Sequence, residues 1–196
     1  MIRRLAALAL LALLVPSLIT GCSGRGARKN ASRVPRTAED SLSWWRMRAD
    51  SIESALGSLD KVERPPDPGT ETAGYTAWFD SGAVRVVHET VDLGPRGSGS
   101  NRYYFERGEP RLTVEQGAVP ADTGQRLVPL ERAMLFVDFG RLVAATMTLD
   151  NVKTWVSGDE AAVVLSHARR LRATAQDARS SPGAGAPSGD TKPARR

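Results

Sequence analysis

One five-residue pattern occurs three times in the chain, as Trp78-Phe79-Asp80-Ser81-Gly82, Tyr104-Phe105-Glu106-Arg107-Gly108 and Phe136-Val137-Asp138-Phe139-Gly140. Each copy has two bulky residues that favour strands, then an acidic residue, a variable residue and a glycine. The acidic side chain can cap a tight turn, and the glycine can adopt the positive φ that many hairpin turns require. The pattern therefore predicts three turns, each joining two strands.

The residues after each glycine read as strands. Val84, Val86 and His88 alternate with Arg85, Val87 and Glu89, and Leu112 and Val114 alternate with Arg111, Thr113 and Glu115. Such alternation is typical of a strand with one buried face. Residues 141–149 are more continuously apolar, which favours a central strand. We predict three consecutive hairpins, about six strands, in an antiparallel meander with one buried face.

The repeat resembles the hairpin units of MORN-type proteins, which also run aromatic–aromatic–acid–x–glycine. The resemblance covers about five residues in each unit. The glycines here are 26 and 32 residues apart, a longer and less regular spacing than in that family. The resemblance therefore implies hairpins and nothing further.

A helix is predicted before the strands. Thr37 with Asp40 three residues later is close to a capping box, which marks a helix start. The apolar residues that then fall on one helical face are Leu42, Trp45, Ala49, Ile52, Leu56 and Leu59. Trp44 lies off this stripe, and two interpretations stay open for it: contact with a membrane interface, or a widening of the apolar face. Residues 65–69 (PPDPG) end the segment.

A second helix is predicted after the strands. Ser157 with Glu160 forms a capping box. One stripe contains Val164, His167, Leu171 and Ala175, and Val163 and Ala168 widen it. The predicted fold class is therefore α+β: an N-terminal helix, an antiparallel meander and a C-terminal helix packing on the sheet, with both helices on its apolar face.

The N-terminus has the features of an export signal. Arg3 and Arg4 are followed by an unbroken apolar run, Leu5 to Leu14, which is too short to span a bilayer core of about 30 Å but suits a signal peptide. The run leads into Leu18-Ile19-Thr20-Gly21-Cys22. This stretch resembles the lipobox of bacterial lipoproteins. The resemblance covers about the first 23 residues and implies cleavage between Gly21 and Cys22, with lipid on Cys22.

The chemistry of Cys22 suits that role. Its thiol can form a thioether with diacylglycerol, and cleavage frees an α-amino group for a further acyl chain such as palmitate. Two or more chains anchor a protein stably, at about 0.8 kcal/mol per buried methylene. Cys22 is the only cysteine, so it has no disulfide partner within the chain. An aspartate directly after the cysteine often retains such proteins in the inner membrane. Position 23 is a serine instead, which favours the outer membrane if the cell is Gram-negative.

The net positive charge of the chain is concentrated in its two ends. The whole chain carries +5, but residues 1–36 and 176–196 together carry +9, which leaves about −4 for residues 37–175. We therefore divide the chain into a signal peptide (1–21), an anchor and basic flexible linker (22–36), one α+β domain (37–175) and a disordered basic tail (176–196). Basic ends on an acidic domain suit an anionic membrane or cell-wall polymer better than nucleic acid.

The domain carries no recognisable catalytic pattern. His88 and Glu89 are adjacent in a predicted strand, so their side chains point to opposite faces and cannot form an acid–base dyad. His167 reads as a partly buried core histidine. Residues 94–100 (GPRGSGS) lack the ending of a phosphate-binding loop. We expect no cofactor, no metal site and no enzymatic activity.

These observations favour a membrane-anchored, periplasm-facing binding or assembly module. The residues expected on its interaction surface, as types common at binding hot spots, are Trp44, Arg102, Tyr103, Arg107 and Trp155. Its expected partners are the membrane, through Cys22, and an envelope protein or anionic cell-wall polymer. The alternative is a carrier of small ligands or lipids, with a pocket between helices and sheet.

Overall fold

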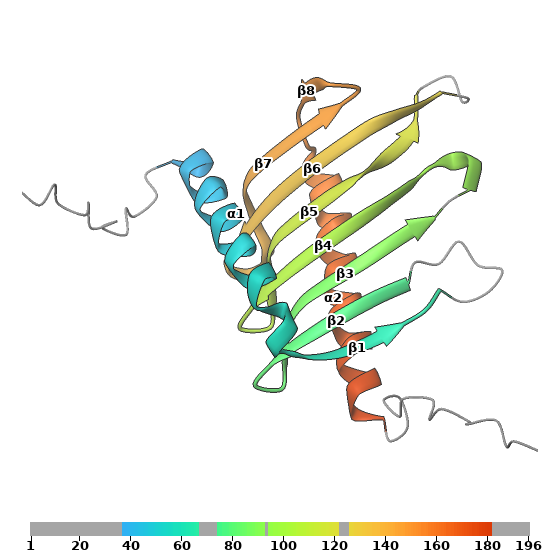
Figure 1. The fold of residues 1–196 in the computed structure, drawn as a ribbon. Coiled ribbons are helices and arrows are strands. Elements are labelled where there is room, and N and C mark those ends of the chain that lie inside the picture. Colours follow the sequence, from blue (N-terminus) through green and yellow to red (C-terminus); the bar gives the residue numbers. More distant parts are fainter. Residues whose placement is uncertain (1–36, 67–73, 93, 122–125, 182–196) are drawn as a thin grey trace, which may run out of the picture. The chain divides into compact units, whose positions relative to one another are not determined.

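The sheet and its two helices are described over residues 37–66, 74–92, 94–121 and 126–181 of a computed structural model (Figure 1). The chain forms β1 (Asp60–Arg64), β2 (Gly74–Asp80), β3 (Ala83–Asp92), β4 (Ser98–Glu106), β5 (Glu109–Pro120), β6 (Leu127–Val137), β7 (Arg141–Leu149) and β8 (Val152–Thr154). All eight belong to one antiparallel sheet whose spatial order follows the chain. Helix α1 (Ala38–Ala55) precedes the sheet and α2 (Gly158–Ser180) follows it. The predicted α+β class is confirmed, but the sheet has eight described strands rather than six.

The three predicted turns are present. Ser81-Gly82 joins β2 to β3 with φ of 50° and 87°, and Arg107-Gly108 joins β4 to β5 with φ of 53° and 78°. Two consecutive positive φ angles are the signature of the tight turns that match strand twist. The third turn is a 3₁₀ segment, η3 (Asp138–Gly140), in which Phe139 has φ of 60°. All three turns lie at the same end of the meander, because they follow alternate strands.

The acidic residue bonds within its turn at Asp80, whereas Glu106 and Asp138 contact arginine side chains. Asp80 accepts a hydrogen bond from the Ser81 hydroxyl at 3.1 Å, within the turn. Glu106 instead receives the Arg48 guanidinium of α1 at 2.8 Å. Arg111 reaches Asp138 at 3.6 Å. The prediction of turn capping is therefore wrong for Glu106, because an arginine on the helix competes for its carboxylate.

Two short strands were not predicted. The first helix ends at Ala55 and continues as a 3₁₀ turn, η1 (Leu56–Ser58), so Leu59 lies outside the helix in which its spacing placed it. Gly57 weakens the helix there, and the chain then turns into β1. At the other edge, β8 has three residues and all are exposed. Neither strand has the alternating apolar residues that identify a half-buried strand.

The helices cover opposite faces of the sheet (Figure 1). The apolar core under α1 contains Leu42, Ala49, Val86, Tyr104, Leu112, Ala133 and Leu135. The core under α2 contains Tyr75, Ala77, Phe79, Val84, Val87, Tyr103, Phe105, Met134, Phe136, Ala161, Val164, Leu165, Ala168 and Ala175. The expectation that both helices cover one apolar face is therefore wrong, and the domain has three layers. Val86 and Val87 illustrate the reason, because consecutive strand residues contribute to different cores.

Helix α2 begins as predicted. The Ser157 hydroxyl accepts a hydrogen bond from the Glu160 amide, and the Glu160 carboxylate accepts one from the Ser157 amide. Val163, expected to widen the buried stripe, is 67% exposed. The helix continues to Ser180, so residues 176–180, assigned to a disordered tail, belong to it. Residues 1–36 and 182–196, with the predicted signal, anchor, linker and rest of the tail, lie outside the described residues.

Candidate functional site

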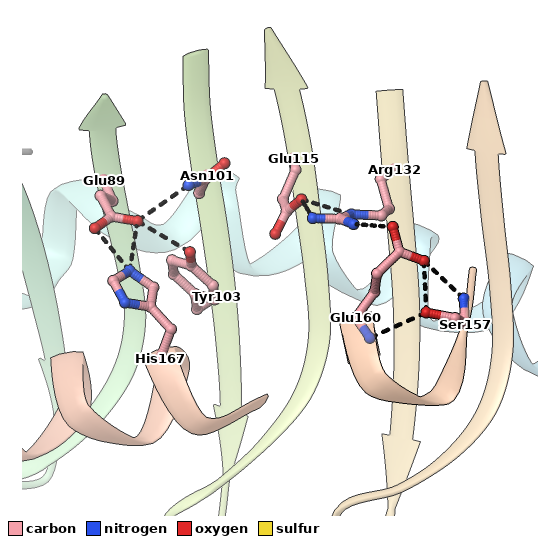
Figure 2. Close-up of polar contacts among 8 residues, drawn as sticks. All are labelled: Glu89, Asn101, Tyr103, Glu115, Arg132, Ser157, Glu160 and His167. Carbon is pink, nitrogen blue, oxygen red and sulfur yellow. Dashed lines mark hydrogen bonds and ion pairs between the residues drawn. The ribbon is translucent and has the colours of Figure 1, made fainter. Parts of the chain in front are cut away.

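A row of polar side chains crosses the sheet on the α2 face. The backbone register pairs Glu89 of β3 with Asn101 of β4, Asn101 with Glu115 of β5, and Glu115 with Arg132 of β6. Figure 2 shows these four residues with the side chains of α2 and its cap that reach them. We call Glu89, Asn101, Glu115 and Arg132 the polar row. Both carboxylates are buried, with Glu89 at 4% and Glu115 at 7% exposure.

Glu89 is surrounded by hydrogen-bond donors. His167 of α2 lies 2.8 Å from Oε1 and 3.0 Å from Oε2, and Oε2 also accepts from the Asn101 amide at 3.0 Å and the Tyr103 hydroxyl at 2.9 Å. Burial alone would raise the pKa of Glu89, but the bonds from His167, Asn101 and Tyr103 together outweigh it and hold that pKa below its usual range. Burial and the neighbouring Glu89 carboxylate raise the pKa of Tyr103.

The other end of the polar row secures the start of α2. Arg132 donates from Nε to Glu115 at 2.7 Å, and a second guanidinium nitrogen also contacts that carboxylate. Arg132 lies 3.7 Å from Glu160, which closes the capping box with Ser157. The bonds with Ser157 lower the pKa of Glu160, and Arg132 adds to that effect. The helix is therefore tied to the sheet at its first turn as well as at His167.

A similar arrangement lies on the opposite face. His88 of β3 is 2.8 Å from the Glu53 carboxylate of α1, and the same carboxylate oxygen accepts from the Tyr104 hydroxyl at 2.6 Å. Trp78 packs against the His88 ring with a centroid separation of 4.6 Å. His88 and Glu89 are thus adjacent residues that bind different helices. The expectation that they do not pair with each other is confirmed, although sequence reasoning missed both partners.

The hydrogen bonds of the two clusters connect the helices to the sheet. The buried Glu89 carboxylate has three partner residues and the buried Glu115 carboxylate has the Arg132 guanidinium, which offsets the cost of burying their charges. Among the described residues, no three His, Cys, Asp or Glu side chains gather closely enough to hold a metal ion. The most direct consequence of the polar row is the fixed position of α2 on the sheet.

The described residues line two hollows of note. The larger, of about 320 Å³, lies on the α1 face. Its charged and polar lining contains Arg46, Asp50, Arg102, Tyr104, Glu115, Gln116, Glu131, Arg132, Thr146 and Thr148, and we call it the polar hollow. The smaller, of about 120 Å³, is lined by Val91, Ser98, Gly99, Asn101, Glu115, Gln116, Gly117, Ala118, Val119 and Leu130. At that volume it is well below the roughly 300–1,000 Å³ of typical ligand pockets.

The structure separates the residues predicted for one interaction surface. Tyr103 is 1% exposed and bonded to Glu89, so its assignment to a surface is wrong. Arg102 lines the polar hollow, whereas Arg107 occupies the β4–β5 turn. Trp44 packs edge-on against Trp45, 5.4 Å between centroids, with the Arg48 guanidinium over both rings. Trp155, directly after β8, is 77% exposed and is the one of the five that offers a large apolar surface.

The sheet edge beside Trp155 is incompletely paired. Strand β8 pairs only with Met147, Thr148 and Leu149, so the outer side of β7 from Arg141 to Thr146 faces no described strand. The prediction that residues 141–149 form a central strand is therefore wrong. Their apolar character has another cause, because Leu142 and Ala145 pack in the α2 core and Ala144 packs in the α1 core.

Exposed apolar side chains border this open strand. Phe139 in the turn before β7 is 96% exposed, and Val152 in β8 is 65% exposed. We call the outer side of Arg141–Thr146, with Phe139, Val152 and Trp155, the β7–β8 edge. Unpaired backbone groups next to apolar side chains are what an added strand requires. No amphipathic periodicity could have identified this edge, because it depends on where β8 stops.

The chain matches no protein-family model, no curated protein and no solved structure. The described helices include none with the length and apolar content needed to cross a membrane.

Proposed function

We propose that this chain is a lipoprotein of the bacterial cell envelope whose domain is a binding module that docks a partner protein along the β7–β8 edge. The observation that carries the docking site is the six-residue stretch of β7 that faces no described strand and is bordered by Phe139, Val152 and Trp155. An extended segment of the partner would add to β7 through backbone hydrogen bonds, and the apolar side chains would supply contact area.

The anchor supports this role through local concentration. In the proposed arrangement, Gly21 and Cys22 mark the cleavage site, and acyl chains on Cys22 hold the protein to the membrane, with the outer membrane favoured in a Gram-negative cell. The basic linker, residues 22–36, would let the domain extend about 20 Å from the anchor as a flexible coil, and it suits contact with anionic headgroups or cell-wall polymers. A partner in the same membrane would meet the β7–β8 edge at high effective concentration.

A lipid carrier receives less support. The smaller hollow is apolar in part but only about 120 Å³, and the larger one is lined by charged residues. An acyl chain needs an apolar cavity, because charged groups lose their hydration against it.

The anchor and the docking edge can be tested separately in cells. Wild type should incorporate an alkyne-labelled fatty acid and fractionate with the membrane, whereas Cys22→Ser should lose the label. After in-cell crosslinking and mild detergent extraction, wild type should carry a near-stoichiometric protein partner. The double variant Val152→Lys/Trp155→Ser should keep its label and lose the partner, because charge and loss of apolar area disfavour strand addition.

Leu127→Lys is the matched control, since Leu127 is an exposed apolar residue at the start of β6 and lies outside the β7–β8 edge. It should retain the partner. Labelling that persists in Cys22→Ser would refute the anchor. A wild type without a protein partner would refute the binding module, and a partner retained by the double variant would refute the edge as its site.

A further inference from the structure

Six charged residues line the polar hollow, and two of them, Glu115 and Arg132, pair with each other. Arg46 and Asp50 come from α1, four residues apart and so on the same helical face, and Arg102 and Glu131 come from the sheet. Among the described residues, none of the four makes an ion pair. Arg46 donates to the Thr146 hydroxyl at 2.8 Å, and Arg102 donates to the Gln116 amide oxygen at 2.7 Å. In contrast, arginines such as Arg48 and Arg132 bind carboxylates.

The two arginines stand at opposite ends of an apolar floor. The register places Arg102, Val114, Ala133 and Thr146 in one row across β4 to β7. Three strand spacings, about 14 Å between the outer Cα atoms, separate Arg102 from Thr146, where Arg46 is held. Val114 and Ala133 lie between these two positions and line the hollow, which leaves room over them for a molecule the size of an amino acid or dipeptide. The volume of about 320 Å³ agrees with that size.

The acidic residues decide which charges a ligand must carry. Glu131 lies in the next row of the sheet, paired with Gln116 on one side and Thr148 on the other. Asp50 lines the hollow from α1. A simple anion would meet the arginines and also two carboxylates of its own sign. A simple cation would meet the two carboxylates and also two arginines of its own sign. A ligand with both an ammonium and a carboxylate group can satisfy both sets through charge-assisted hydrogen bonds.

We infer that the polar hollow binds a small zwitterion, an amino acid or short peptide with free amino and carboxylate ends. The carboxylate binds at one of the two arginines and the ammonium at Asp50 or Glu131, while a small side chain covers Val114 and Ala133. Because the site has one wall on α1 and the other on the sheet, a bound ligand joins the two layers and stabilises the folded domain. The site is separate from the β7–β8 edge and does not depend on the proposed docking function.

Titration with capped peptides tests the inference directly. The full chain, purified in mild detergent, is titrated by calorimetry with alanine, alanyl-alanine, N-acetyl-alanyl-alanine, alanyl-alanine amide and the doubly capped dipeptide. At least one of the two free zwitterions should bind. Each single cap should weaken dipeptide binding at least about tenfold, because it removes one charge-assisted contact. Methyl resonances of Val114 and Ala133 should shift during the titration.

The variants Arg102→Gln and Glu131→Gln should each weaken binding by a similar factor. Their controls are Arg126→Gln and Glu63→Gln, exposed charges outside the hollow that pair with Asp150 and Lys61. The inference is overturned if no zwitterion binds at up to about 10 mM, a range that covers millimolar affinities. Binding of the N-acetyl peptide as tight as that of the free one would equally overturn it, as would shifts confined to residues outside the hollow.

Discussion

Two adjacent residues of β3 hold the two helices from opposite sides of the sheet. His88 binds Glu53 of α1, and Glu89 binds His167 of α2. Consecutive residues of a strand point to opposite faces, so this two-residue segment is sufficient to reach both layers. The histidine is on the strand in one pair and on the helix in the other. The Glu89 carboxylate is buried and the Glu53 carboxylate is partly buried, so both depend on their donors to offset lost hydration.

Replacing Glu89 by glutamine tests the contribution of its charge. Because the folded-state pKa of Glu89 is lowered, its carboxylate stabilises the fold above the ordinary carboxyl pKa of 4.5, and this stability is lost as the pH falls through the lower folded-state value. At neutral pH, Glu89→Gln should reduce the free energy of unfolding by about 1.5–3 kcal/mol, the range for hydrogen bonds to a charged group. Urea unfolding from pH 7 down to pH 3 should show the two proteins converging.

Glu63→Gln is the control for this experiment, since Glu63 lies on the exposed edge strand β1 and pairs only with Lys61 in the described part of the chain. It should change stability by no more than about 0.5 kcal/mol at any pH. Curves for wild type and Glu89→Gln that stay parallel through the acid range would show that the charge of Glu89 contributes nothing to folding.

At the scale of elements, the turns do more than reverse the chain. Gly82 and Gly140 have nearly the same φ, 87° and 85°. A Cβ on Gly82 would meet nothing within 4 Å, whereas a Cβ on Gly140 would lie 2.3 Å from Leu165 Cδ2 of α2. The third turn is therefore packed against the helix, and its glycine is needed for space as well as for backbone conformation.

Alanine at these two positions separates the two requirements. Gly82→Ala should cost about 1–2 kcal/mol, the strain of a left-handed conformation for a residue with a Cβ. Gly140→Ala should cost at least about 1 kcal/mol more, because Leu165 must move within a packed core. Chemical denaturation of both variants measures the difference. Equal losses would mean that the β6–β7 turn does not pack against α2.

The elements that the sequence predicts correctly are those defined by local chemistry. The turns need only two or three residues of the right type, and the start of α2 needs only Ser157 and Glu160. Strands β1 and β8 were missed because DKVER and VKT are short and mostly exposed. The placement of the helices on opposite faces was missed because an apolar stripe shows that a helix is buried, but not against which face.

The candidate sites were harder to predict than the fold. Glu53 and His88 are 35 residues apart and Glu89 and His167 are 78 apart, so no sequence spacing links them. Tyr103 was assigned to a surface on residue type alone. Tyr103 and Tyr104 are adjacent in a strand, so their side chains point to opposite faces of the sheet, one toward each helix. The polar hollow depends on α1 lying across β4 to β7, which only the folded chain defines.

At the scale of the whole molecule, stability should decrease from the central strands to the edges. Strands β3 to β6 lie between two neighbouring strands, and β3, β4 and β6 contribute side chains to both cores while β5 contributes to the α1 core. In contrast, β8 is three exposed residues and β1 is mostly exposed. Amide hydrogen exchange should therefore be slowest at positions such as Val87, Tyr103 and Leu112 and fastest, among strands, in β8. Protection in β8 equal to that in β4 would contradict this ranking.

The helices also determine when the domain can be completed during synthesis. Arg46, in the middle of the first helix, is bonded to Thr146, which the ribosome adds 100 residues later. Arg179, near the end of the last helix, returns to Asp60, made 119 residues earlier. The apolar stripe of the first helix is therefore covered only after nearly the whole sheet has been synthesised. The apolar side chains of the earliest strands that face the last helix are covered only when that helix has been made. A nascent chain that stops short of β7 would expose both apolar surfaces, so the domain is expected to fold only after its synthesis is almost finished.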